Sequence, residues 1–233
     1  MTTAPDQTPS IVPPYRLFSG WLQILALAMP LFWGAGAEAA ERRILAFGDS
    51  LTAGYGLPAA EALPAQLERR LRADGFEVKV VNAGVSGDTT GMGVERLDYA
   101  LSDGPVDIAL VELGANDMLR GLPPRETRAN LEKIIETFRS KGVNVIIAAM
   151  ASSNNWGQAY RQEFDSIYPD LATKFGVTMV PFFMEGVWGD PALLIGDGLH
   201  PNPAGVRKIV DKITPYVERA LAPSGAAQES RAR

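Results

Sequence analysis

A serine, a histidine and an aspartate in this chain have the types and spacing of a hydrolytic triad. Ser50 follows a short apolar run, and Asp197 lies three residues before His200. A serine hydroxyl is a poor nucleophile until a neighbouring base removes its proton. His200 is the only histidine in the 233 residues, so an imidazole base has to be His200. A carboxylate this close can orient the imidazole within one loop, as a Ser-His-Asp triad requires.

The elements that would position these residues are short apolar runs alternating with amphipathic helices. A helix is expected around 63–71, where leucines recur every four residues, and another around 131–138. Alternation of this kind predicts a parallel sheet with helices on both faces, an α/β fold. The five strands are expected at residues 43–47, 78–82, 106–113, 143–150 and 177–180.

Two later helices contain prolines that should affect them in opposite ways. The helix expected over 160–175 contains Pro169, which should kink or break it. In the last helix, Asn202 can cap the first turn and Pro203 can occupy it. The inner stripe of that last helix is formed by Val206, Ile209, Val210 and Ile213.

Chemistry is expected at one edge of this sheet, because ligands of parallel sheets gather at the carboxyl ends of the strands. Segments 48–56, 82–90 and 112–117 follow the first three strands, and segment 197–202 precedes the last helix. They bring a serine, a glycine, an asparagine and a histidine to that edge from distant parts of the sequence.

These segments resemble the four signature blocks of the SGNH/GDSL hydrolases. The blocks are Gly48-Asp-Ser-Leu51, Gly84, Gly114-Ala-Asn-Asp117 and Asp197-x-x-His200. The bacterial thioesterase/lysophospholipase/arylesterase branch is further suggested by the segments 86–90, 167–171 and 181–185, and the resemblance covers residues 44–216. One departure is Ala115, where many relatives have a second glycine.

The resemblance implies a flavodoxin-like, three-layer α/β/α sandwich with a parallel five-stranded sheet. It also implies hydrolysis of carboxylic esters or thioesters, including aryl esters, acyl thioesters and lysophospholipids, through an acyl-enzyme intermediate. Ser50, Asp197 and His200 would be the triad. The oxyanion would be bound by the backbone N–H groups of Ser50 and Gly84 and by the Asn116 side chain, donors already in place for the developing charge.

Each of these residues is commonplace when taken alone, since a serine after a strand often caps a helix and Asn116-Asp117 could form a turn. Asp49 and Asp88 are expected to be structural, through loop hydrogen bonds or a helix cap. Two alternative functions remain at this point: a carbohydrate acetylesterase, and a non-catalytic acyl- or lipid-binding protein on the same scaffold. The complete set of Ser, Gly, Asn, Asp and His argues against the second.

The expected substrate is a small-molecule ester or thioester with an acyl or aryl group. Apolar segments 118–122 and 181–188 lie near strand ends, where they could wall a groove for that group. Leu119, Leu122 and Trp188 are the candidate substrate-binding residues, and many of the other apolar side chains there are expected to be core.

The amino-acid composition argues against several other classes of function. With a net charge of -5 and no run of basic residues, nucleic-acid binding has little support. The absence of cysteine excludes disulfides and a cysteine nucleophile. One histidine and no cysteine cannot supply the ligands of a zinc hydrolase, so neither a metal nor a cofactor is expected.

The N-terminus has the features of a signal peptide. Residues 17–37 are uncharged, and Ala37-Glu-Ala39 is the small-x-small pattern of a cleavage site. We therefore expect a signal peptide over 1–40 that is cleaved near Ala39 or Ala40, a hydrolase domain over 41–222 and a disordered polar tail over 223–233. We therefore expect the protein to be periplasmic or secreted, with no stable membrane span after processing. The weakly basic start of the chain leaves open an uncleaved anchor in the inner membrane.

Overall fold

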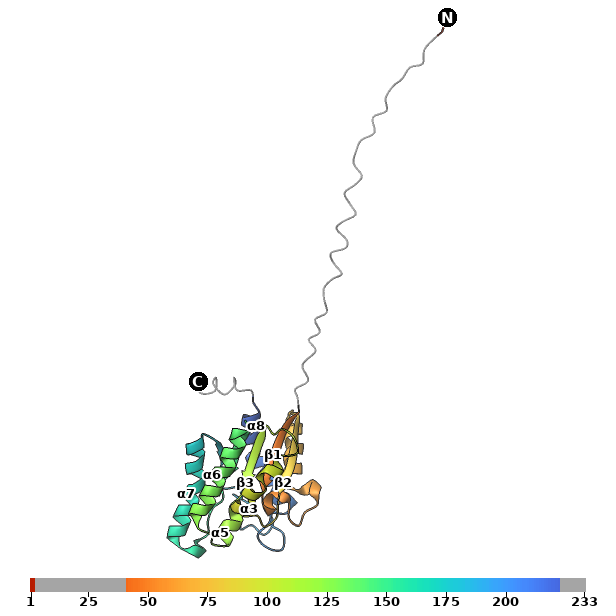
Figure 1. Ribbon diagram of the computed structural model, residues 1–233. Helices are drawn as coiled ribbons and strands as arrows, with labels where there is room; N and C mark the ends of the chain where they lie inside the picture. The colour runs from red at the N-terminus through yellow and green to blue at the C-terminus, as the bar shows by residue number, and fades with distance from the viewer. Residues whose placement is uncertain (3–40, 223–233) are drawn as a thin grey trace, which may run out of the picture. The chain divides into compact units, whose positions relative to one another are not determined.

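Strands and helices alternate along the chain in the computed structural model, which describes residues 1–2 and 41–222 (Figure 1). The expected signal peptide, apart from its first two residues, and the expected tail over 223–233 lie outside the described residues. No helix in the described part is long and apolar enough to cross a membrane. The strands are β1 (Arg42–Gly48), β2 (Val78–Gly84), β3 (Ile108–Glu112), β4 (Asn144–Ala148) and β5 (Thr178–Val180).

These strands form one parallel sheet in the order β2-β1-β3-β4-β5, which confirms the expected fold class. Near its carboxyl edge, Gly48 of β1 pairs with Gly84 of β2 on one side and with Glu112 of β3 on the other. The chain first crosses outward from β1 to β2, and then returns to β3 on the opposite side of β1.

Helices cover both faces of the sheet. Because parallel crossovers are right-handed, the two directions of travel place their helices on opposite faces. Helices α2 (Leu63–Ala73) and α8 (Pro203–Leu221) contact each other on one face. Helices α3 (Thr90–Glu95), α6 (Pro124–Ser140) and α7 (Gln158–Phe175) lie side by side on the other (Figure 1). The shorter helices are α1 (Ser50–Ala53), α4 (Leu97–Ala100), α5 (Ala115–Leu119), η1 (Ala59–Glu61) and η2 (Asn154–Trp156).

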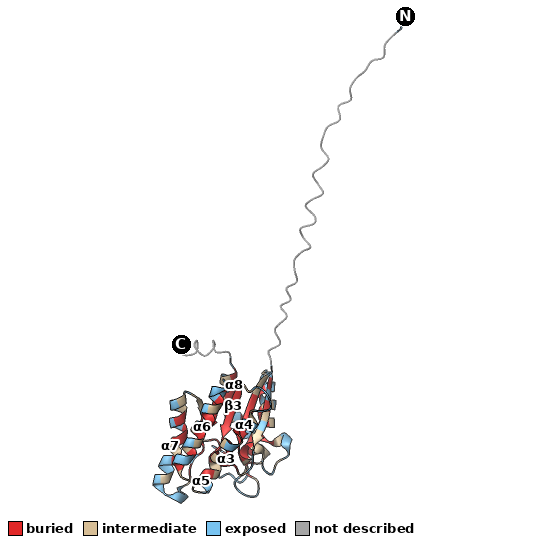
Figure 2. Ribbon diagram, in the orientation of Figure 1, coloured by how far each residue is buried: buried red, intermediate tan, exposed pale blue. Residues whose placement is uncertain are grey.

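The core lies between the sheet and the inner faces of these helices, where Figure 2 shows the buried residues. The leucines of α2 at positions 63, 67 and 71 are all buried, as their spacing predicts. The predicted stripe of α8 is buried as well. Asn202 caps α8, accepting hydrogen bonds from the N–H groups of Ala204 and Gly205, and Pro203 opens the helix, both as expected.

Helix α7 continues through Pro169, so the break expected there is absent. A proline inside a helix costs about 3 kcal/mol because it removes one hydrogen bond and crowds the preceding turn. Burying a large apolar side chain contributes about 1.5–3 kcal/mol, so several such side chains outweigh that cost. The buried side chains of α7 lie on both sides of the proline: Phe164, Ile167, Tyr168 and Leu171.

A crevice is expected outside the ends of β1 and β3, because these neighbouring strands lead to helices on opposite faces of the sheet. Strand β1 leads to α2 on one face, and β3 leads to α6 on the other. Ser50 follows β1 and Asn116 follows β3, so the topology directs both residues to this crevice.

Candidate active site

Ser50 begins the single-turn helix α1 directly after β1. The Asp49 side chain caps this turn by accepting a hydrogen bond from the Leu51 N–H at 3.0 Å. Gly54 ends the turn in the left-handed conformation, with φ +82°. The sharp change from strand to helix fixes Ser50 at the carboxyl edge of the sheet.

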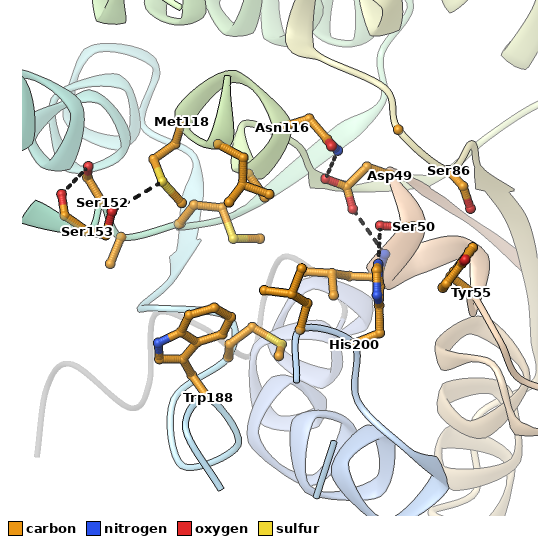
Figure 3. Close-up of a pocket in the computed structure, with 18 of the residues that line it drawn as sticks. Asp49, Ser50, Tyr55, Ser86, Asn116, Met118, Ser152, Ser153, Trp188 and His200 are labelled. Atoms are coloured by element: carbon orange, nitrogen blue, oxygen red, sulfur yellow. Dashed lines mark hydrogen bonds between the residues drawn. The ribbon is translucent and has the colours of Figure 1, made fainter. Parts of the chain in front are cut away.

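The side chains of Ser50 and His200 point toward one another (Figure 3). His200 Nε2 lies 2.9 Å from Ser50 Oγ, and His200 Nδ1 lies 2.6 Å from Asp197 Oδ2. A carboxylate only accepts hydrogen bonds, so the ring proton belongs on Nδ1. Nε2 is then free to accept the serine proton.

Asp197 is held in place by the backbone of its own loop. Its Oδ1 accepts hydrogen bonds from the backbone N–H groups of His200 at 3.0 Å and Leu199 at 2.9 Å. These bonds lower the pKa of Asp197 to about 2, so the carboxylate is charged near neutral pH. The capped start of α8 follows at Asn202 and fixes the far end of the loop.

Asn116 reaches the same crevice from the first turn of α5. Its Nδ2 donates a hydrogen bond to Asp49 Oδ2 at 3.0 Å (Figure 3). A side-chain amide carries two N–H donors, so the second N–H remains available for a substrate oxygen.

Gly84 does not contribute to the crevice. Its N–H donates to Asn82 Oδ1 at 3.0 Å, and the residue is absent from the lining of the pocket around Ser50. A Cβ at this position would lie 2.7 Å from Ala53 Cα and 2.9 Å from Asp49 O. The glycine therefore lets α1 pack closely on β2, and the structure gives no support to its expected role as an oxyanion donor.

Gly87 lies where Gly84 was expected to act. It lines the pocket with φ +87°, and its N–H makes no hydrogen bond within residues 41–222. The signal in the sequence was the second glycine of the 82–90 segment, which is preceded by Ser86 in a loop rather than in a strand.

The loop that carries Gly87 is tied to the sheet by Arg96. Its Nε pairs with Asp88 at 2.5 Å, and its two terminal nitrogens each donate at 2.9 Å to the carbonyls of Ala83 and Gly48. Arg96 thus joins the ends of β1 and β2 to the loop, and Asp88 has the structural role expected of it.

A cavity of about 530 Å³ opens beside Ser50 and His200. Leu119 and Trp188 line it, whereas Leu122 does not. Met118 and Trp188 line the opposite side of the cavity from Ser50 and His200 (Figure 3). The main apolar lining is formed by Met118, Leu119, Met150, Phe182, Met184 and Trp188.

Two buried carboxyl groups lie behind Ser50. Burial raises the pKa of Asp49 to about 6, against the opposing effect of hydrogen bonds from Leu51 and Asn116. Burial and the neighbouring Asp49 charge raise the pKa of Glu112 well above its ordinary value. Glu112 was not among the site residues expected from the sequence, and it ends a strand that is otherwise apolar.

The chain matches the model of the GDSL-like lipase/acylhydrolase family over residues 46–208. It is 40% identical to an arylesterase of Vibrio mimicus over 182 residues, which are 78% of this chain and 90% of that protein. It is 37% identical to the thioesterase 1/protease 1/lysophospholipase L1 of Escherichia coli K12, over 80% of this chain and 86% of that protein.

The fold is shared by solved structures of the same family. AlinE4, an SGNH-hydrolase family esterase, superimposes with a TM-score of 0.66 at 45% identity. The match covers 78% of this chain and 98% of AlinE4.

Proposed function

The chain belongs to the GDSL-like lipase/acylhydrolase family and hydrolyses carboxylic ester or thioester bonds, and we propose that Ser50, His200 and Asp197 perform this reaction. The observation that carries the proposal is the chain of contacts from Ser50 Oγ to His200 Nε2 at 2.9 Å and from His200 Nδ1 to Asp197 at 2.6 Å. A non-catalytic acyl-binding protein has no need of a base aligned on a hydroxyl group.

The reaction begins when Ser50 Oγ attacks the acyl carbon and His200 Nε2 takes the serine proton. The charged Asp197 stabilises the imidazolium that forms. His200 then gives the proton to the leaving alcohol or thiol, and a water molecule, activated by the same base, hydrolyses the acyl-enzyme.

The oxyanion of each tetrahedral intermediate needs donors fixed beforehand. We propose the free N–H of the Asn116 amide and the backbone N–H groups of Ser50 and Gly87. Gly87 replaces the expected Gly84, because the Gly84 N–H already donates to Asn82.

The substrates that fit this pocket are esters or thioesters with an apolar acyl or aryl group. Leu119 and Trp188 are the proposed contacts for that group. The relatives named as an arylesterase and as a thioesterase and lysophospholipase support this substrate class. An apolar cavity favours it over the sugar that a carbohydrate acetylesterase would bind.

A fluorophosphonate probe tests the assignment of Ser50. The purified protein should be labelled at Ser50 and lose its esterase activity in proportion to the labelling. Ser50→Ala should fold, remain unlabelled and lose nearly all turnover. A folded Ser50→Ala variant that kept a tenth of the wild-type kcat would exclude Ser50 as the nucleophile.

We also propose that residues 1–40 are a signal peptide, that 41–222 form the hydrolase domain and that the protein acts in the periplasm or outside the cell. The support is the uncharged segment 17–37 followed by Ala37-Glu-Ala39. Intact-mass analysis of protein from its native host should give an N-terminus at Ala40 or Glu41. An intact N-terminus on membrane-bound protein would favour the uncleaved anchor.

A further inference from the structure

Glu112 places a carboxyl group in the core directly behind the turn that carries Ser50. It is fully buried at the end of β3, in register with Gly48. Its Oε2 accepts hydrogen bonds from the Thr52 hydroxyl at 2.7 Å and from the Asp49 N–H at 3.4 Å. A Cβ on Gly48 would lie 2.6 Å from that oxygen, so the glycine makes room for the carboxyl group. The other oxygen, Oε1, has no hydrogen-bond partner within residues 41–222.

Asp49 links this buried group to the catalytic surface. One of its oxygens accepts from the Leu51 N–H in the Ser50 turn, and the other accepts from Asn116 Nδ2 (Figure 3). A single carboxylate thus holds both the nucleophile's turn and the amide proposed to bind the oxyanion. A protonated carboxyl would have an O–H donor in place of one acceptor, and its bond to the Asn116 amide would be weakened or lost.

The charges around the pair decide which carboxyl is ionised. His200 faces Asp49 from the pocket, and the Arg96 guanidinium lies at the Gly48 carbonyl. The Tyr168 hydroxyl, which donates to the Leu113 carbonyl, lies near Glu112, Asp49 and Asp117. Two adjacent buried carboxyls do not ionise together at neutral pH. Glu112 is the more deeply buried and is remote from His200, so it keeps the proton and Asp49 carries the charge.

We propose that Asp49 is a positioning residue for the Asn116 amide, that Glu112 supports it as a protonated acid, and that protonation of Asp49 in mild acid releases Asn116 and lowers turnover. The inference rests on the proposed function, in which Ser50, His200 and Asn116 act on the ester. It gives the two buried carboxyls a part in the pH dependence of the enzyme.

The consequence is a steeper acid limb than a lone histidine base produces. Full activity would require two groups to have lost a proton, His200 and Asp49. A plot of log kcat/KM against pH would then approach a slope of two at acid pH, whereas one titrating base gives a slope of one.

The first test measures this slope with a 4-nitrophenyl ester for the wild type, Asp49→Asn and Glu112→Gln. Asp49→Asn should lower kcat at least tenfold at pH 8 with little change in KM. The new side chain has one oxygen for two donors, so with that oxygen at the Leu51 N–H its NH₂ group would face the NH₂ group of Asn116 and the hydrogen bond would be lost. The remaining activity of Asp49→Asn should fall with a slope of one. A wild-type slope of one would overturn the inference, whether or not Asp49→Asn folds.

Glu112 is tested by comparing a close mimic with a truncation. Glu112→Gln has the shape of the protonated acid and can still accept from Thr52, so it should restore most of the kcat lost in Glu112→Ala and keep the slope of two. If Glu112→Gln lost as much kcat as Glu112→Ala, a negative charge at Glu112 would be required and the proposed protonation would be wrong.

The second test is a double-mutant cycle with Asn116→Ala. Removing an oxyanion donor lowers kcat by about 10²–10³. If Asp49 acts through Asn116, adding Asp49→Asn to Asn116→Ala should lower kcat less than twofold further. If the kcat losses of Asp49→Asn and Asn116→Ala instead multiplied in the double variant, Asp49 would not act through Asn116.

Fluorophosphonate labelling separates this inference from the proposed function. If the triad assignment fails, the wild type is not labelled at Ser50. If only the present inference fails, the wild type is labelled and active, but its acid limb has a slope of one and a folded Asp49→Asn keeps its kcat.

Discussion

The ring of Tyr55 lies against the imidazole of His200, with the ring centroids 4.6 Å apart and the planes tilted by 38°. Tyr55 comes from the loop that follows α1, and it lines the pocket while remaining half exposed. The segment that carries Ser50 therefore also covers one side of the His200 ring.

Tyr55→Ala should lower kcat/KM by about threefold to tenfold, since a paired aromatic contact contributes about 0.5–1.5 kcal/mol. Tyr55→Phe keeps the ring and should retain nearly full activity. Steady-state kinetics on a soluble aryl ester would show the difference. Equal losses in the two variants would mean that the hydroxyl group matters, not the ring contact.

The fold could be predicted because its signals are local. The buried leucines of α2 recur at helical spacing, and Asn202 with Pro203 marks the start of α8. Pro169 is an exception, because the penalty it brings is local whereas the packing that outweighs it is tertiary.

The site could be predicted only as far as its strand ends. Strand β2 extends to Gly84, two residues beyond the predicted end at 82. The Gly84 N–H donates to the Asn82 side chain, and Gly87, three residues further on, lines the pocket instead. Whether Leu119 or Leu122 faces the cavity likewise depends on where α5 ends. The partners of Glu112 lie on β1 and α1, so no local pattern could reveal them.

The two glycines after β2 should respond differently to alanine. Gly84→Ala would press on Ala53 and Asp49, and overpacking of this kind costs about 1–3 kcal/mol, so its melting temperature should fall. At Gly87 the nearest atom to an added Cβ is 3.8 Å away, but φ is +87°. Leaving that conformation would redirect the N–H.

We therefore expect Gly87→Ala to lower kcat at least tenfold with a smaller loss of melting temperature than Gly84→Ala. Thermal unfolding and kcat measured on both variants would check this. A Gly87→Ala variant with wild-type kcat would remove its N–H from the proposed oxyanion donors.

The apolar wall should determine how much the enzyme gains from a longer acyl chain. A buried CH₂ group contributes about 0.8 kcal/mol, and Leu119 and Trp188 are each about half exposed before substrate binds. Leu119→Ala and Trp188→Ala should each raise KM about threefold to tenfold for an octanoyl ester and much less for an acetyl ester.

Leu122→Ala is the matched control, since Leu122 comes from the same segment but does not line the cavity. It should leave the ratio of the two KM values unchanged, with thermal unfolding used to verify folding. A change in that ratio as large as for Leu119→Ala would place the acyl group elsewhere.

Replacing the buried Glu112 should stabilise the protein relative to the wild type, and the difference in the free energy of unfolding should grow as the pH rises. The pKa of Glu112 is raised above its ordinary value, so the folded protein keeps a proton that the unfolded chain loses. The free energy of unfolding of the wild type therefore falls as the pH rises from the ordinary glutamate pKa toward the raised one. Asp49 acts with the same sign between its ordinary pKa of 3.8 and about 6.

Glu112→Gln lacks the titration of Glu112. Its stability relative to the wild type, measured by urea unfolding, should therefore increase steadily between pH 5 and pH 8. Glu185→Gln is a suitable control, because Lys212 lowers the pKa of Glu185 and its titration is complete below this range. Its difference from the wild type should therefore be constant between pH 5 and pH 8. If the Glu112→Gln difference were also constant, Glu112 would be ionised in the folded protein over this range, as it is in the unfolded chain, and its proposed role as a protonated acid would be wrong.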